Sequence, residues 1–71
     1  MTDIQKLDIA IKNSGLKIVF IAKQLGLTRE GLYKKLNGET EFKASEISMM
    51  QKILGLTNEQ RDSIFFAVEV E

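Results

Sequence analysis

Apolar residues recur at helical spacing along the chain, in five short segments separated by glycines and capping residues. In the first segment, Ile4, Leu7 and Ile11 fall on one stripe of a helix, and Gly15 ends the pattern. The same reasoning predicts five helices, at about 3–13, 18–25, 29–36, 44–54 and 58–67. We therefore expect an all-α fold in a single domain that spans the chain.

The second segment, KIVFIAKQLG, is ambiguous. Its run of β-branched residues suits a strand. However, Ile18, Ile21 and Leu25 lie on one face of a helix, and Gly26 stands where a helix C-cap belongs. We interpret the segment as a helix.

The fifth segment begins with TNEQ, in which Thr57 and Gln60 predict a capping box. The last residues, AVEVE, alternate with a period of two, which fits either a short edge strand or a frayed end. Phe65 either closes the core or forms a dimer surface together with Phe66. The candidate surface for a partner or a second copy in this tail consists of Phe66, Val68 and Val70.

The composition argues against an enzyme. The chain has no cysteine and no histidine, so it lacks a thiol nucleophile, a thiolate metal site and the commonest general base and metal ligand. Its ten carboxylates are scattered singly, and a chain of 71 residues leaves little room for a substrate pocket. We expect no metal, no cofactor and no small-molecule substrate.

The longest uninterrupted apolar run, IVFIA, has five residues. A signal-peptide core needs about seven and a membrane span about eighteen. We therefore expect a cytoplasmic protein without a membrane partner.

Charge is unevenly distributed although the net charge is zero. Residues 1–38 hold seven cations and three anions, whereas residues 39–71 hold three cations and seven anions. A basic half of this kind can face a polyanion such as nucleic acid.

Only the residues GLT separate the second and third predicted helices. A connection of this length that contains glycine is typical of a helix-turn-helix unit. Ala22 is small where the two helices would press together, and Gly26 can adopt a positive φ without steric cost. Leu27 and Leu32 supply apolar contacts at the expected spacing.

The stretch FIAKQLGLTREGLYKKLNG resembles the helix-turn-helix of the phage Cro and Xre-type repressors. The longer run YKKLNGETEFKASEISMMQKILGLTNEQRDSIFFA resembles the small Cro-like regulators carried by prophages of Gram-positive bacteria, which share the pattern LNG…F…SEI…ILGLT…FF. Together the two similarities cover about residues 4–67. They imply a five-helix, repressor-like DNA-binding domain that controls phage or prophage promoters, often as a dimer on inverted repeats.

The resemblance makes the third helix the recognition helix, with five base-facing positions: Thr28, Arg29, Glu30, Tyr33 and Lys34. The chemistry fits, because Arg29 or Lys34 can donate to guanine O6 and N7 and Glu30 can accept from the cytosine amino group. The Thr28 hydroxyl and the first amides of the helix suit a phosphate. Each residue also has a simpler interpretation: Thr28 as a cap only, Glu30 as a solvated side chain or a partner of Lys34, and Tyr33 as part of the core.

At the start of its second helix the family usually carries polar residues that contact phosphate, often a glutamine. This sequence has IVF at positions 18–20 instead. We therefore expect phosphate contacts from four other residues: Lys12, Lys17, Lys35 and Asn37.

Two residues depart from what a DNA-binding helix pair needs. Phe20 either packs on the first helix or the tail, or belongs to an exposed patch used by a protein partner. Gly31 lies inside the recognition helix and costs about 1 kcal/mol relative to alanine. It either allows close approach to DNA or is a tolerated weakness.

The sequence thus predicts a sequence-specific DNA-binding transcriptional regulator, with double-stranded operator DNA as its partner and a homodimer as its working form. The alternative is a protein-interaction module that acts as an anti-repressor or a corepressor partner, for example on a phage repressor protein. Net neutrality, the acidic C-terminal half and the apolar residues 18–20 motivate that alternative.

Overall fold

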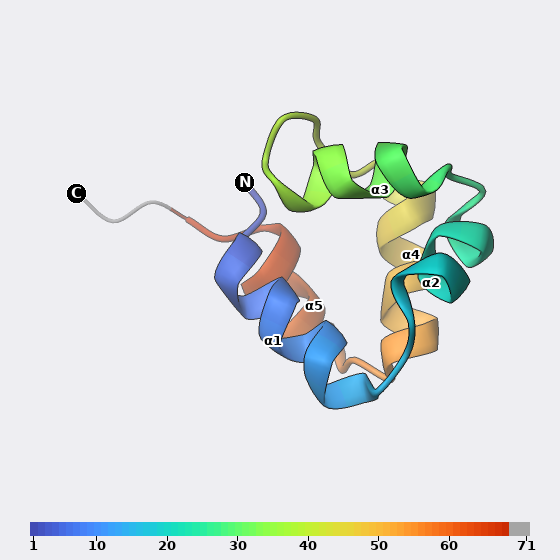
Figure 1. Cartoon of the computed structure of the whole chain (residues 1–71). Helices are drawn as coiled ribbons and strands as arrows, with labels where there is room; N and C mark the ends of the chain where they lie inside the picture. The colour runs from blue at the N-terminus through green and yellow to red at the C-terminus, as the bar shows by residue number, and fades with distance from the viewer. Residues whose placement is uncertain (69–71) are drawn as a thin grey trace.

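The computed structural model describes residues 1–68 of the 71-residue chain, and these residues form five α-helices and no strand (Figure 1). The helices are α1 (Ile4–Ser14), α2 (Ile18–Leu25), α3 (Arg29–Leu36), α4 (Ala44–Leu54) and α5 (Asn58–Phe65). The predicted all-α class with five helices is therefore confirmed. The β-branched segment that a strand would also have suited is helix α2.

Polar side chains cap the first turns of α1, α3 and α5. Asp3 caps α1, and Thr28 Oγ1 accepts a hydrogen bond from the backbone N of Gly31 at 3.0 Å. Helix α5 has the full capping box: the backbone N of Gln60 donates to Thr57 Oγ1 at 3.1 Å, and the backbone N of Thr57 donates to Gln60 Oε1 at 2.8 Å. Each cap satisfies amides that the helix cannot pair and contributes about 1 kcal/mol.

A three-residue turn, Gly26–Thr28, joins α2 to α3. Gly26 adopts a left-handed conformation with φ 70° and ψ 27°, which a residue with a side chain adopts only at a cost. The backbone N of Leu27 donates to the carbonyl of Ala22 at 2.9 Å, so the turn folds back on the last turn of α2. Ala22 is only 3% exposed, as expected of a small residue where two helices press together.

Helix α5 ends at Phe65, two residues earlier than predicted. Phe66 leaves the helical conformation with φ −123° and ψ 38°. The backbone N of Ala67 donates to the carbonyl of Met1 at 3.0 Å. In a longer helix this amide would donate to a carbonyl of α5 instead, so the contact with the N-terminal segment accompanies the end of the helix. Ala67 and Val68 belong to neither a helix nor a strand, and the remainder of the AVEVE tail lies outside the described residues.

The hydrophobic core joins all five helices. Helix α4 packs against α1, α2 and α5, while α3 packs against α1 and α2. Four side chains, one from each of α1 to α4, are fully buried: Leu7, Ile21, Leu32 and Met50. Phe65 of α5 meets Phe42 edge to face, with ring centroids 5.4 Å apart, and so closes the core, as one of its two interpretations held. Each buried side chain of this size contributes about 1.5–3 kcal/mol.

Candidate nucleic-acid interface

Helix α3 has a buried side and an exposed side. On the buried side Leu32 has no exposed surface, Lys35 is 8% exposed and Leu36 is partly buried against the core. The four candidate base-contacting residues of the helix are all exposed: Arg29, Glu30, Tyr33 and Lys34. The capped first turn and the short connection to α2 anchor this exposed side at its N-terminal end.

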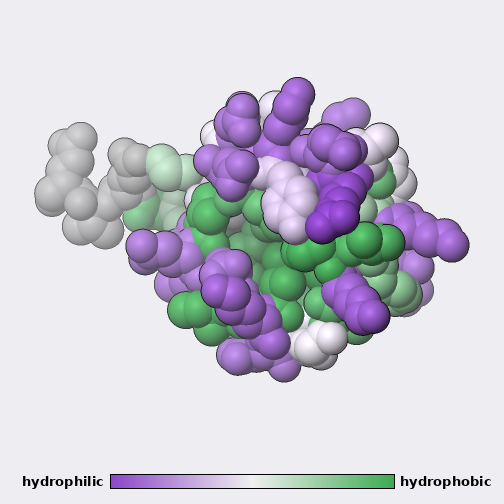
Figure 2. Space-filling view, viewed as in Figure 1, coloured by the Kyte–Doolittle hydropathy of each residue, from purple (hydrophilic) through white to green (hydrophobic). Residues whose placement is uncertain are grey.

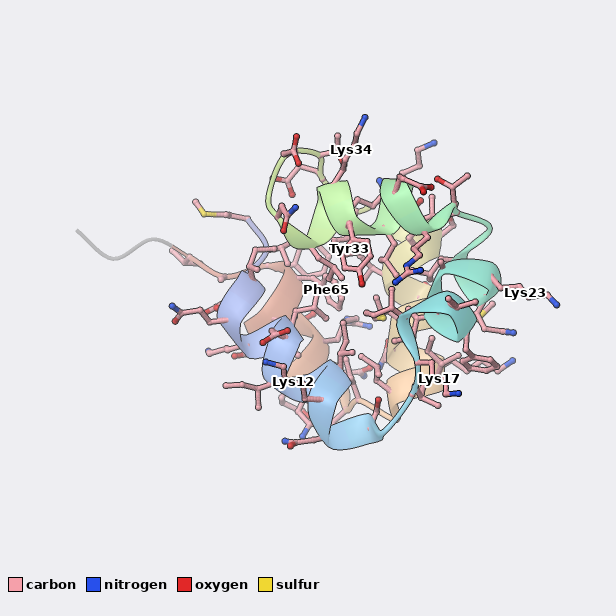
Figure 3. The ribbon with its side chains drawn as sticks, in the orientation of Figure 1. Lys12, Lys17, Lys23, Tyr33, Lys34 and Phe65 are labelled. Atoms are coloured by element: carbon pink, nitrogen blue, oxygen red, sulfur yellow. The ribbon has the colours of Figure 1, made fainter. Side chains whose placement is uncertain are left out.

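The Arg29 guanidinium stacks on the ring of Tyr33, 5.8 Å from the ring centroid. A cation over an aromatic face at this distance gains about 0.5–1 kcal/mol at an exposed site, which restrains a long side chain before any partner binds. Figure 3 shows that Lys34 points away from the body of the molecule, whereas Tyr33 points toward the opening between α3 and α1. Tyr33 is 40% exposed, so it combines partial packing with an accessible ring.

Thr28 and Glu30 are also accessible on the first turn of α3. The Thr28 hydroxyl oxygen is used as the helix cap, but its proton can still be donated to a phosphate or a base. Within residues 1–68, no ion pair joins Glu30 to Lys34, so the predicted pairing along the helix is not formed in this structure. Both side chains can therefore face a partner.

Three of the expected phosphate contacts lie on different elements around α3. Lys12, near the end of α1, pairs with Asp8 at 2.9 Å, but both side chains are exposed, and such a pair adds little stability. Lys17 precedes α2, is exposed and makes no side-chain capping bond. Asn37 ends α3 and lines the same hollow as Lys12. All three side chains can turn toward an anion.

The fourth expected phosphate contact, Lys35, requires a correction. Its side chain is buried, and its Nζ donates to the carbonyl of Glu41 at 2.8 Å and pairs with Glu46 Oε1 at 3.1 Å. A lysine with both partners inside the protein does not reach a phosphate. The spacing alone indicates that Lys35 is buried, because it lies three residues after the buried Leu32 and so on the same side of the helix.

A hollow of about 660 Å³, which we call the apolar groove, lies beside α3 and along α1. Figure 2 shows it as a green, hydrophobic area surrounded by purple side chains. Its apolar lining comes from five residues besides Tyr33: Ile4, Ile11, Leu16, Ile18 and Leu36. Its polar lining includes Gln5, Asp8, Lys12 and Asn37. The groove could not be predicted from the sequence, because Ile4, Ile11 and Ile18 fall on helical stripes typical of a core, which the neighbouring helices cover only in part.

Other apolar side chains are exposed away from the groove. Phe20 is 43% exposed on α2 and is not part of the core. In the tail, Phe66 is 54% exposed and Val68 is 83% exposed. Val70, the third residue of the predicted partner surface, lies outside the described residues.

Between residues 1 and 68, no helix has both the length and the apolar character needed to cross a membrane. No protein-family model, curated protein or solved structure matches the chain.

Proposed function

We propose that the chain is a sequence-specific DNA-binding transcriptional regulator of the Cro-like repressor type. It would place α3 in the major groove of operator DNA and block or redirect polymerase. One observation carries the proposal: α3 exposes Arg29 and Lys34 on a short helix that a three-residue turn joins to α2. This arrangement supports a helix-turn-helix unit with α3 as its reading element.

The exposed side chains of α3 match the hydrogen-bonding groups of base edges. Arg29 and Lys34 carry donors for guanine O6 and N7, and Glu30 carries acceptors for the cytosine amino group. Thr28 can donate to a phosphate at the helix N-terminus, where the unpaired amides also favour an anion. The stacking on Tyr33 restrains Arg29, which lowers the entropy cost of placing its guanidinium against a base.

Lys12, Lys17 and Asn37 would hold the duplex backbone on either side of α3, while Lys35 takes no part. A single reader of 71 residues contacts few base pairs. Useful specificity therefore calls for a homodimer on two half-sites about one helical turn apart.

The direct test measures binding to duplex DNA by fluorescence anisotropy between about 50 and 200 mM salt. Each phosphate contact releases counterions, so the affinity should fall steeply with salt, and Lys17→Ala should reduce the slope by about one. Lys52→Ala removes a lysine of α4 that is also exposed and is the matched control. Equal slopes for the wild type and Lys17→Ala would refute the phosphate contact, and no binding at any salt would refute the proposal.

A second candidate is a protein-interaction module that acts as an anti-repressor or corepressor partner. The apolar groove favours it, because the start of α2 presents Ile18 to that groove where the resembled family carries phosphate-contacting polar residues. An apolar surface of this kind beside α3 suits a protein better than a phosphate backbone. The discriminating variant is Ile18→Lys, which should weaken binding to a phage repressor protein but maintain or strengthen binding to a duplex.

A further inference from the structure

We propose that the buried ion pair between Lys35 and Glu46 fixes the position of α3 on the fold, which makes Lys35 a positioning residue for the reading surface. The inference rests on the proposed function in one respect, namely that α3 carries the surface that reads DNA. The placement of α3 itself can be measured without DNA.

The two side chains meet at the inner side of α3. Lys35 Nζ lies 3.1 Å from Glu46 Oε1 and donates to the carbonyl of Glu41 at 2.8 Å. The same ammonium lies 5.9 Å from the ring centroid of Phe42, a buried residue of the core. Lys35 and Glu46 are only 8% and 6% exposed. The lysine is therefore held from three directions by the loop and helix that follow α3.

Glu46 has a second role at the same oxygen. Its Oε1 accepts a hydrogen bond from the backbone N of Lys43 at 2.8 Å, which caps the first turn of α4. One carboxylate oxygen thus joins the start of α4 to the last turn of α3. The loop between the two helices contacts the same ammonium, because the carbonyl of Glu41 accepts a hydrogen bond from Lys35 Nζ.

Helix α3 has few other buried contacts. It is eight residues long, and its only buried side chains are Leu32 and Lys35, with Leu36 partly buried. Apolar contacts are not directional, so Leu32 and Leu36 hold the helix against the core without fixing its rotation or its position along its axis. Hydrogen bonds and ion pairs require defined atoms at defined distances. The short turn from α2 holds the N-terminal end of α3. The pair therefore determines where the C-terminal end lies, while Leu32 and Leu36 keep the helix attached to the core.

A buried ion pair is a weak source of net stability, because the desolvation of both charges offsets most of their attraction. Replacing both partners by well-packed hydrophobic side chains of similar volume is often neutral or stabilising, whereas removing one partner is strongly destabilising. Positioning and stability can thus be separated by experiment. The double variant Lys35→Met with Glu46→Gln keeps the volume of both side chains, and the new side-chain amide retains an oxygen for the cap of α4.

The experiment measures amide hydrogen exchange, residue by residue, in the wild type and the double variant. We expect a similar thermal midpoint but about tenfold faster exchange of the α3 amides, because local opening of α3 becomes easier while global unfolding does not. Lys34→Met is the matched control, since it removes the neighbouring exposed lysine and should leave exchange unchanged. If the double variant unfolds, Glu46→Gln alone keeps the shape and should show the same α3-specific effect at a smaller size.

Unchanged exchange in α3, or equal acceleration in all five helices, would overturn the inference, because a merely structural pair would affect the whole fold together. DNA binding provides the second measurement. The double variant should bind a selected duplex about tenfold more weakly, equivalent to about 1.4 kcal/mol, with non-specific binding unchanged. If the wild type selects no duplex, the proposed function fails, while the exchange data still decide whether the pair positions α3.

Discussion

The sequence LGLT occurs twice in the chain and makes the same turn both times. It joins α2 to α3 at residues 25–28 and α4 to α5 at residues 54–57. Gly26 and Gly55 are both left-handed, with φ of 70° and 65°. In both turns the backbone N of the leucine after the glycine donates a hydrogen bond to a carbonyl of the preceding helix at 2.9 Å. The threonine then caps the next helix.

The helices that follow these turns differ in their first turn. Three residues after the threonine, α3 has Gly31 and α5 has Gln60. Gln60 completes a capping box with Thr57, whereas Gly31 has no side chain to return a hydrogen bond to Thr28. The first turn of α3 is therefore less fully capped.

The two helices also differ in charge and in the residue at the one equivalent position that both of them bury. Helix α3 contains three cations and one anion, and α5 contains one cation and two anions. Seven residues after the threonine, α5 buries Ile64 and α3 buries Lys35. The comparison shows that the turn fixes how two helices meet, while the residues beyond it decide which surface the second helix offers.

The largest expected effect comes from the buried position that distinguishes the two helices. Lys35→Met leaves Glu46 buried without its cation and should lower the free energy of unfolding by about 3 kcal/mol. The matched change in α5, Ile64→Met, conserves volume and should cost less than about 1.5 kcal/mol. Urea denaturation measures both, and equal losses would show that the ion pair does not set α3 apart.

The next effect concerns the first residue of each helix. Arg29→Ala should weaken binding to a selected duplex by about 1–3 kcal/mol and relax the preference at one base position. Asn58→Ala, at the equivalent place in α5, should leave duplex binding unchanged. Because Arg29 is exposed and its contact with Tyr33 contributes at most about 1 kcal/mol, the substitution should lower the free energy of unfolding by no more than that. Unaltered affinity and base preference in Arg29→Ala would remove the main proposed base contact.

The two glycines test whether the turns are equivalent. An added Cβ at Gly26 or Gly55 meets no atom within 4 Å, so the cost of alanine comes from the left-handed backbone alone. Each variant should lose about 1–2 kcal/mol of unfolding free energy, and the two losses should agree. Losses that differ by more than about 1 kcal/mol would mean that the turns are under different strain.

The smallest effect converts the first turn of α3 into that of α5. Gly31→Gln adds helix propensity and the second half of a capping box, so it should raise the unfolding free energy by up to about 1 kcal/mol. The new Cβ would lie 3.1 Å from Thr28 Oγ1, a tight contact that limits the gain. Gln60 shows that the arrangement is possible beside a capping threonine. A marked loss of duplex affinity in this variant would show that Gly31 allows close approach to DNA.

The sequence was sufficient to predict the helices, because glycines and capping threonines punctuate a clear helical pattern. It failed where a contact joins distant residues. The end of α5 depends on the hydrogen bond from the backbone N of Ala67 to the carbonyl of Met1. No pattern of neighbouring residues predicts a contact between the two ends of the chain. Lys35 was assigned to the surface by its charge, although its spacing from Leu32 placed it inside.

The candidate site divides in the same way. The exposure of Glu30 and Lys34 followed from the periodicity of α3, since each is two residues from Leu32 and so lies on the opposite side of the helix. Arg29 is three residues before Leu32, and its exposure goes with its place as the first residue of the helix. The apolar groove could not be predicted from the periodicity. It depends on the distance between α1 and α3, which is set by the packing of the whole domain.

The most direct test of DNA reading by α3 is selection from a pool of random duplex DNA at moderate salt, with the bound fraction sequenced. We expect enrichment of an inverted repeat with half-sites about one helical turn apart, or of a single half-site if one copy reads DNA with a partner. No enrichment, from protein shown to be folded, would contradict the proposal and leave the basic side of α3 as a surface for another protein.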